Sequence, residues 1–191
     1  MIAELVLHPE PVAGSPMTMR WLLPEVRLPV GRLLHVPAAL GELVAGGTVR
    51  TAWCEPHALR IELARGLSWR EHGAQVRTAI RESLTRLDQW RTDDDRAPLL
   101  RTIVDEVLAG TVGAYIRSHG GLVDVVGVTA DTVTVALGGA CGHCPASVQT
   151  LHQRFETAVR QRYPDLRRVI VTTAADGRRP AALLRPRRRA G

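Results

Sequence analysis

Two of the three cysteines, Cys141 and Cys144, lie three positions apart in the stretch from Gly138 to Pro145. Two thiolates at this spacing can bind one metal ion or cluster, or they can close a disulfide with each other. A zinc ion or an iron–sulfur cluster usually takes four protein ligands, so one motif supplies half of a closed site. The motif is therefore either half of a metal site that a second copy completes, or a redox dithiol.

The residues around these cysteines predict a turn that leads from a strand into a helix. Glycines before and between the cysteines allow unusual backbone angles and a close approach of main-chain amides. Pro145 suits the first position of a helix. Unpaired N–H groups and the helix dipole stabilise thiolates at such a position, and amide donors to sulfur tune an anionic cluster. The residues around the cysteines therefore favour anionic sulfur ligands. We expect His143, which stands between the two cysteines, to face solvent.

The third cysteine and the N-terminus bear on the cellular compartment. Cys54 follows Trp53 in a strand-like segment, and we interpret it as a small, partly buried apolar residue. Residues 1–7 include Glu4 and no basic leader, and no apolar run approaches the ~18 residues that a membrane span needs. Three cysteines without an export signal also argue against a disulfide scaffold. We expect a cytoplasmic protein without a membrane segment.

The net charge of +6 comes from the C-terminal end. All 25 basic residues are arginine, and six of them follow Asp176, after which no acidic residue occurs. The remaining 19 arginines match the 19 acidic residues, so the rest of the chain is formally neutral. A basic end beside a neutral body is weak evidence for nucleic-acid binding. We interpret residues 176–191 as a disordered, Arg-rich tail and expect no nucleic-acid partner.

The patterns predict an α/β protein, more closely α+β, with two small domains. Residues 91–98 are polar and acidic and contain a proline, so we interpret them as a linker between domains at 1–90 and 99–175. In the first domain we expect strand-like residues at 17–23, a helix at 37–45, a hairpin from 48–53 and 58–63, and an amphipathic helix. The apolar stripe of that helix is Val76, Ile80, Leu84 and Leu87.

The second domain is predicted to run α-β-β-α-β, with the cysteines at the strand-to-helix turn. A strong 3.6-residue apolar pattern predicts one helix over 99–116, which Gly120 and Gly121 end. Residues 122–128 and 132–137 predict a hairpin, and 169–173 predict a last strand. The helix between them should bury one apolar face, made of Val148, Leu151, Phe155 and Val159.

Three segments together resemble the C-terminal domain of the NifU family: 103–108, 118–121 and 139–147, the last reading GACGHCPAS. The similarity covers about residues 98–173. It implies that two copies dimerise and that Cys141 and Cys144 of each hold one bridging iron–sulfur cluster, usually 4Fe–4S. It also implies a carrier or scaffold that is not an enzyme. Its partners would be a second copy of the chain, a cluster donor and apoprotein clients.

Residues 1–90 resemble a degenerate form of the N-terminal domain of Nfu-type carriers. The stretch from His8 to Pro11 and the stretch from Trp21 to Pro24 are similar to the opening of that domain. One departure lies in the C-terminal half, where His119 replaces the acidic residue of the family's "DGG" turn. We expect this change to alter the local hydrogen bonding.

Two other functions remain open for the cysteine pair. Cys-Gly-His-Cys is the tetrad of protein disulfide isomerases, which would make the chain a thiol–disulfide oxidoreductase. Ala140 stands where that family has tryptophan, proline follows the second cysteine, and about 47 residues remain after Cys144, too few to complete a thioredoxin domain. The other alternative is a structural zinc ion bridging two chains, because four thiolates suit zinc as well as a cluster.

Overall fold

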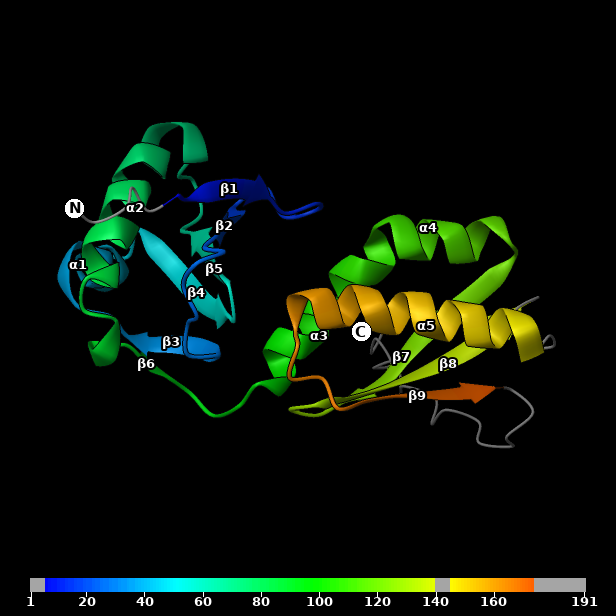
Figure 1. The fold of residues 1–191 in the computed structure, drawn as a ribbon. Coiled ribbons are helices and arrows are strands. Elements are labelled where there is room, and N and C mark those ends of the chain that lie inside the picture. The colour runs from blue at the N-terminus through cyan, green and yellow to red at the C-terminus, as the bar shows by residue number, and fades with distance from the viewer. Residues whose placement is uncertain (1–5, 140–144, 174–191) are drawn as a thin grey trace, which may run out of the picture.

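The computed structural model describes residues 6–139 and 145–173, and it confirms a mixed α and β protein (Figure 1). Two separate sheets divide the described part into an N-terminal and a C-terminal lobe, joined by the segment that leads into helix α3 (Ala97–Ala109). The Arg-rich end that the sequence predicts to be disordered lies outside the described residues.

The N-terminal lobe is built on an antiparallel six-stranded sheet in the order β1-β2-β5-β4-β3-β6. The predicted hairpin is confirmed, because β4 and β5 pair in the expected place. The strands are β1 (His8–Pro11), β2 (Thr18–Leu22), β3 (Gly31–His35), β4 (Val49–Glu55), β5 (Ala58–Leu63) and β6 (Arg91–Thr92).

Two helices and a 3₁₀ turn complete this lobe: α1 (Ala38–Ala45), α2 (Trp69–Leu84) and η1 (Leu87–Gln89). Helix α1 confirms the expected helix at 37–45. Helix α2 contains Val76, Ile80 and Leu84 of the predicted stripe, but it ends before Leu87, which lies in η1. Ser68 caps α2 by accepting a 3.3 Å hydrogen bond from the Glu71 backbone N–H, which is the Ser-x-x-Glu start signal. The Ser83 hydroxyl donates to the Pro37 carbonyl at 2.8 Å and so ties α2 to the start of α1.

The segment predicted as a linker, 91–98, contains ordered elements. Arg91–Thr92 forms β6 and pairs with β3, and the Asp93 side chain accepts a 2.9 Å hydrogen bond from the Arg32 backbone N–H. Ala97 already begins α3. Only the middle of the segment therefore lies outside helix and strand, and the proposed domain limits stay predictions.

The single helix predicted over 99–116 is wrong, because the structure has two helices there. α3 ends at Ala109, and α4 (Thr111–Ser118) begins after Gly110, whose backbone is extended (φ −85°, ψ −153°). The chain turns tightly here: a Cβ on Gly113 would lie 1.7 Å from the Leu108 carbonyl oxygen. The apolar pattern continues across the break, so periodicity alone did not reveal it.

The C-terminal lobe places three helices over one face of a three-stranded sheet (Figure 1). Strands β7 (Gly121–Val128) and β8 (Thr132–Gly139) form the predicted hairpin, and β9 (Arg168–Thr173) lies parallel to β8. Helix α5 (Pro145–Arg162) crosses from β8 to β9. Its face is buried as expected at Leu151, Phe155 and Val159, while the side chain of Val148 lies outside the description.

Buried charges join the two lobes. Glu55, at the end of β4, accepts hydrogen bonds from Arg20 at 2.7 Å and from Arg162 of α5 at 3.1 Å. Glu106 of α3 accepts from Arg162 at 2.7 Å and also binds Arg60. Burial lowers the pKa of Arg162, but Glu55 and Glu106 outweigh this effect, and the pKa is raised overall.

Candidate metal centre at the cysteine turn

The predicted ligands Cys141 and Cys144, and His143 between them, lie outside the described residues. The structure describes the elements on either side of them. β8 ends at Gly139 and α5 begins at Pro145, so residues 140–144 connect a strand to a helix. The unpaired N–H groups at the start of this 18-residue helix lie next to the motif in the chain.

The strand that leads into the motif ends in a tight contact between glycines. Gly139 has a φ of +65° and pairs with Gly121 of β7. A Cβ on Gly139 would lie 2.3 Å from the carbonyl oxygen of Gly120, which itself has a φ of +69°. Because L side chains rarely adopt such angles, glycine is required where the hairpin approaches the motif.

Both elements that flank the motif are anchored in the core of the C-terminal lobe. Val135 and Leu137 of β8 are buried, and so are Phe155 and Val159 of α5. Most buried residues of this core come from α3, β8, α5 and β9. Tyr163 and Leu166 add to it from the segment after α5, and Val30 from the N-terminal lobe. The lobe therefore gives the strand-to-helix connection two fixed ends.

Cys54 lies in the core of the N-terminal lobe and is fully buried, whereas the sequence predicted partial burial. Burial raises the pKa of its thiol well above the ordinary value, which disfavours the thiolate that metals and electrophiles require. Among residues 6–139 and 145–173, no group of three or more His, Cys, Asp or Glu side chains could hold a metal ion. The described residues thus offer no second set of ligands.

His119 acts locally at the end of α4. Its Nδ1 lies 2.9 Å from the Tyr115 carbonyl oxygen and 3.1 Å from the Ser118 hydroxyl. The His119 and Tyr115 rings are in contact, with centroids 4.4 Å apart. In place of an acidic side chain, the imidazole makes polar contacts with the last turn of the helix before Gly120.

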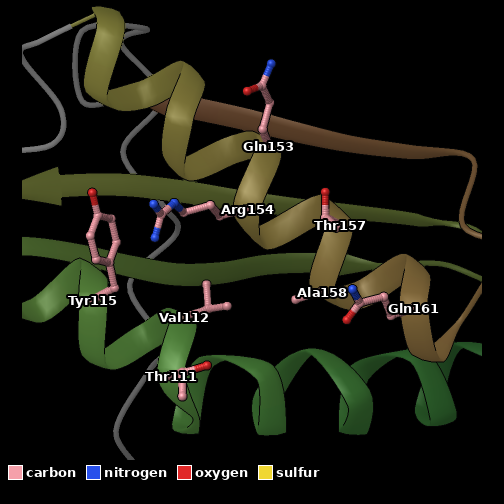
Figure 2. Close-up of a pocket in the computed structure, with 8 residues that line it drawn as sticks. All are labelled: Thr111, Val112, Tyr115, Gln153, Arg154, Thr157, Ala158 and Gln161. Atoms are coloured by element: carbon pink, nitrogen blue, oxygen red, sulfur yellow. The ribbon is translucent and has the colours of Figure 1, made fainter.

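A groove that the sequence did not reveal lies between α4 and α5 (Figure 2). Its volume is about 380 Å³, and the guanidinium of Arg154 lies over the Tyr115 ring at 4.3 Å from the centroid. Gln153, Thr157 and Gln161 add polar groups from α5. Gln153, Thr157 and Gln161 recur every four residues, as on one helix face, but nothing in this spacing indicates that α4 packs beside them.

Comparison with known proteins agrees with this geometry. The family profile described as "NifU-like domain" matches residues 104–170, a range that includes both cysteines of the motif. Fe/S biogenesis protein NfuA of Yersinia enterocolitica is 32% identical over 82 residues, which cover 42% of this chain and 42% of that protein. Nitrogen fixation protein NifU of Anabaena is 38% identical over 60 residues, covering 31% of this chain and 54% of the relative.

The matches are local: the chain spans less than half the length of the NfuA relative. The family match begins within α3 and ends within β9, so it covers the helices, hairpin and crossover that surround the cysteine turn. The resemblance seen in the sequence is thereby confirmed for this region. The C-terminal part of the chain contains a NifU-like domain.

Proposed function

We propose that this protein is an iron–sulfur cluster carrier that binds a cluster through Cys141 and Cys144 and hands it to apoproteins. The observation that carries the proposal is the NifU-like match over residues 104–170, which contains the Cys-x-x-Cys motif between β8 and α5. The relatives named for Fe/S biogenesis and nitrogen fixation support the same role.

Two chains would share one cluster, which we propose to be 4Fe–4S. A cluster of this type takes four thiolates, and the motif offers two. The only other cysteine of the sequence, Cys54, is buried in the core of the N-terminal lobe. The missing pair of ligands would therefore come from Cys141 and Cys144 of a second copy, which makes the cluster-bound form a homodimer.

The cluster is cargo, so the proposed carrier exchanges ligands and catalyses no reaction. A thiolate of the client protein displaces one carrier thiolate at a time, and the iron and sulfide oxidation states do not change. Each freed carrier thiolate is left at the start of α5, where the helix N-terminus favours negative charge. Partners would be a cluster donor and apoprotein clients.

We propose a cytoplasmic location, because reducing conditions keep thiols available for cluster ligation. In the described part of the chain, no helix is both long and apolar enough to cross a membrane.

Anaerobic reconstitution with iron and sulfide tests the proposal directly. We expect a broad absorbance band near ~400 nm, about four irons and four sulfides per dimer, and a doubled mass in solution. Cys141→Ser and Cys144→Ser should each abolish the band and the cluster-bound dimer. Cys54→Ala is the matched control and should keep both.

Three other outcomes would overturn the proposal that this protein is a carrier. A colourless dimer that retains zinc, with two cysteines from each chain, would identify a structural metal bridge. A metal-free monomer with a reversible Cys141–Cys144 disulfide would identify a thiol–disulfide oxidoreductase. Loss of the cluster in folded Cys54→Ala would contradict the assignment of two ligands per chain.

A further inference from the structure

The N-terminal lobe contains a pocket far in sequence from the cysteine motif. It has a volume of about 420 Å³ and lies between helix α2 and strands β1 and β2, which Figure 1 labels. Trp21 of β2 and Trp69 of α2 supply its aromatic walls, with ring centroids 6.1 Å apart and planes tilted by 60°. Its volume falls in the range of pockets that hold small molecules, roughly 300–1,000 Å³.

A glycine inside α2 keeps this pocket open. Gly73 lines the pocket in the second turn of the helix, where glycine costs about 1 kcal/mol relative to alanine. A Cβ at Gly73 would meet no atom within 4 Å, and its φ is not in the left-handed region. The fold therefore gives no steric reason for glycine here, and the space that it leaves belongs to the pocket.

The two tryptophans carry hydrogen-bond donors that the protein does not use. Trp21 is 2% exposed, and neither its indole N–H nor that of Trp69 has an acceptor among the described residues. Trp90 shows the usual arrangement, because its indole N–H donates to the Ser83 carbonyl at 3.0 Å. A buried donor without a partner costs about 1–3 kcal/mol. Both indole nitrogens are also shielded from solvent, so a ligand in the pocket meets the rings and not these N–H groups.

The pocket also has a positive charge without a negative counterpart. The guanidinium of Arg77 lies 5.7 Å from the centroid of the Trp21 ring. No acidic residue lines the pocket, and Arg77 forms no ion pair with any acid in the described part of the chain. A guanidinium held by an aromatic face with its N–H groups available suits a carboxylate.

We propose that this pocket binds a small carboxylate with an apolar or aromatic body. The body would lie against Trp21 and Trp69 in the space that Gly73 leaves, and the carboxylate would face Arg77 at the pocket edge. This ligand site is independent of the proposed cluster chemistry, since none of its residues lies in the NifU-like region.

The probe is 3-phenylpropionate, and its uncharged analogue 3-phenylpropionamide is the matched control ligand. In ¹⁵N-labelled protein, each of the four tryptophans gives its own indole N–H signal. We expect saturable shifts of the Trp21 and Trp69 signals and no shift of the Trp90 signal, with the three signals assigned through Trp21→Phe, Trp69→Phe and Trp90→Phe. The amide should bind at least about tenfold more weakly.

Two variants locate the site. Gly73→Leu fills the pocket and should abolish the shifts while keeping the fold, because leucine is a good helix former and a Cβ at this position meets no atom within 4 Å. Arg77→Gln should reduce binding of the carboxylate to that of the amide. Arg70→Gln, on the same helix but outside the pocket, should change nothing. Absence of saturable shifts, equal binding of acid and amide, or undiminished binding by folded Gly73→Leu would each overturn the proposal.

Discussion

Arg162 donates a 3.1 Å hydrogen bond to Glu55, and this ion pair links the last turn of α5 to the end of β4 in the other lobe. The side chain of Glu55 is 1% exposed, and that of Arg162 is 19% exposed. Arg20 and Arg60 also lie beside Glu55, so this one carboxylate contacts arginines from two strands and one helix. The helix that follows the cysteine motif is thereby fixed against the N-terminal lobe.

Glu55→Gln should strongly destabilise the protein. The substitution keeps the shape of the side chain but leaves three arginines around an uncharged group, and removing one partner from a buried ion pair costs about 3–5 kcal/mol. The measurement is the free energy of unfolding in urea.

The matched control for Glu55→Gln is Asp105→Asn. Asp105 pairs with Arg101 one helical turn away, and both side chains are about half exposed (52% and 50%). Such pairs contribute about 0.3–0.5 kcal/mol. If the two variants lost similar stability, the buried charges between the lobes would have no special structural role.

Gly139→Ala should damage the hairpin end that leads into the cysteine motif. Alanine at a φ of +65° is strained, and its Cβ would lie 2.3 Å from the Gly120 carbonyl oxygen, so we expect a loss of about 2 kcal/mol or more. If the carrier proposal is correct, the cluster content after reconstitution should fall as well.

The neighbouring glycine provides the control. A Cβ on Gly138 would lie 3.7 Å from the Leu122 Cβ, an ordinary contact, so Gly138→Ala should change stability by no more than about 0.5 kcal/mol. Equal stabilities of the two variants in urea would show that the contact between Gly139 and Gly120 does not constrain the hairpin.

Cys54 should resist alkylation in the folded protein. The thiolate is the form that reacts with iodoacetamide, and full burial both raises the pKa of the Cys54 thiol and blocks access to sulfur. The test uses the Cys141→Ser, Cys144→Ser double variant, in which Cys54 is the only cysteine. Mass spectrometry should show no adduct until guanidinium unfolds the chain; labelling at equal rates in both states would contradict the burial.

Local sequence patterns were sufficient to predict most of the elements. The hairpin of β7 and β8 and the burial of Phe155 and Val159 follow from alternation and from helical periodicity, which act over a few residues. The break at Gly110 was missed because the apolar pattern continues from α3 into α4. Strand β6 was missed because two polar residues that pair with β3 carry no strand pattern of their own.

Features that depend on contacts between distant residues could not be predicted from local sequence patterns. The spacing of Cys141 and Cys144 identified them as candidate ligands, and that assignment stays a prediction. Nothing local indicates that Arg162 meets Glu55, 107 positions away, or that Gly73 opens a pocket beside Trp21. Contacts of this kind form only when separate elements pack. Trp69, Gly73 and Arg77 share one face of α2, but their spacing does not indicate that Trp21 of β2 lies opposite them.

Tyr163 should make the protein less stable at alkaline pH. Its side chain is fully buried and its hydroxyl donates a 2.8 Å hydrogen bond to the Ala130 carbonyl oxygen. Burial raises the pKa of Tyr163, so above pH ~10 the unfolded chain releases the phenolic proton first. Stability from this group is therefore complete below pH ~10 and is lost as pH rises further, by up to about 1.4 kcal/mol per pH unit.

Tyr163→Phe separates this effect from general alkaline unfolding. The variant should lose about 1 kcal/mol at neutral pH with the hydrogen bond, yet its stability should fall less steeply above pH ~10. Because burial also raises the pKa of the Cys54 thiol, the comparison belongs in a Cys54→Ala background. Urea titrations at several alkaline pH values measure the slopes, with Tyr115→Phe as the control for loss of a phenol. Parallel slopes for Tyr163→Phe and its parent would show that the buried hydroxyl does not govern alkaline stability.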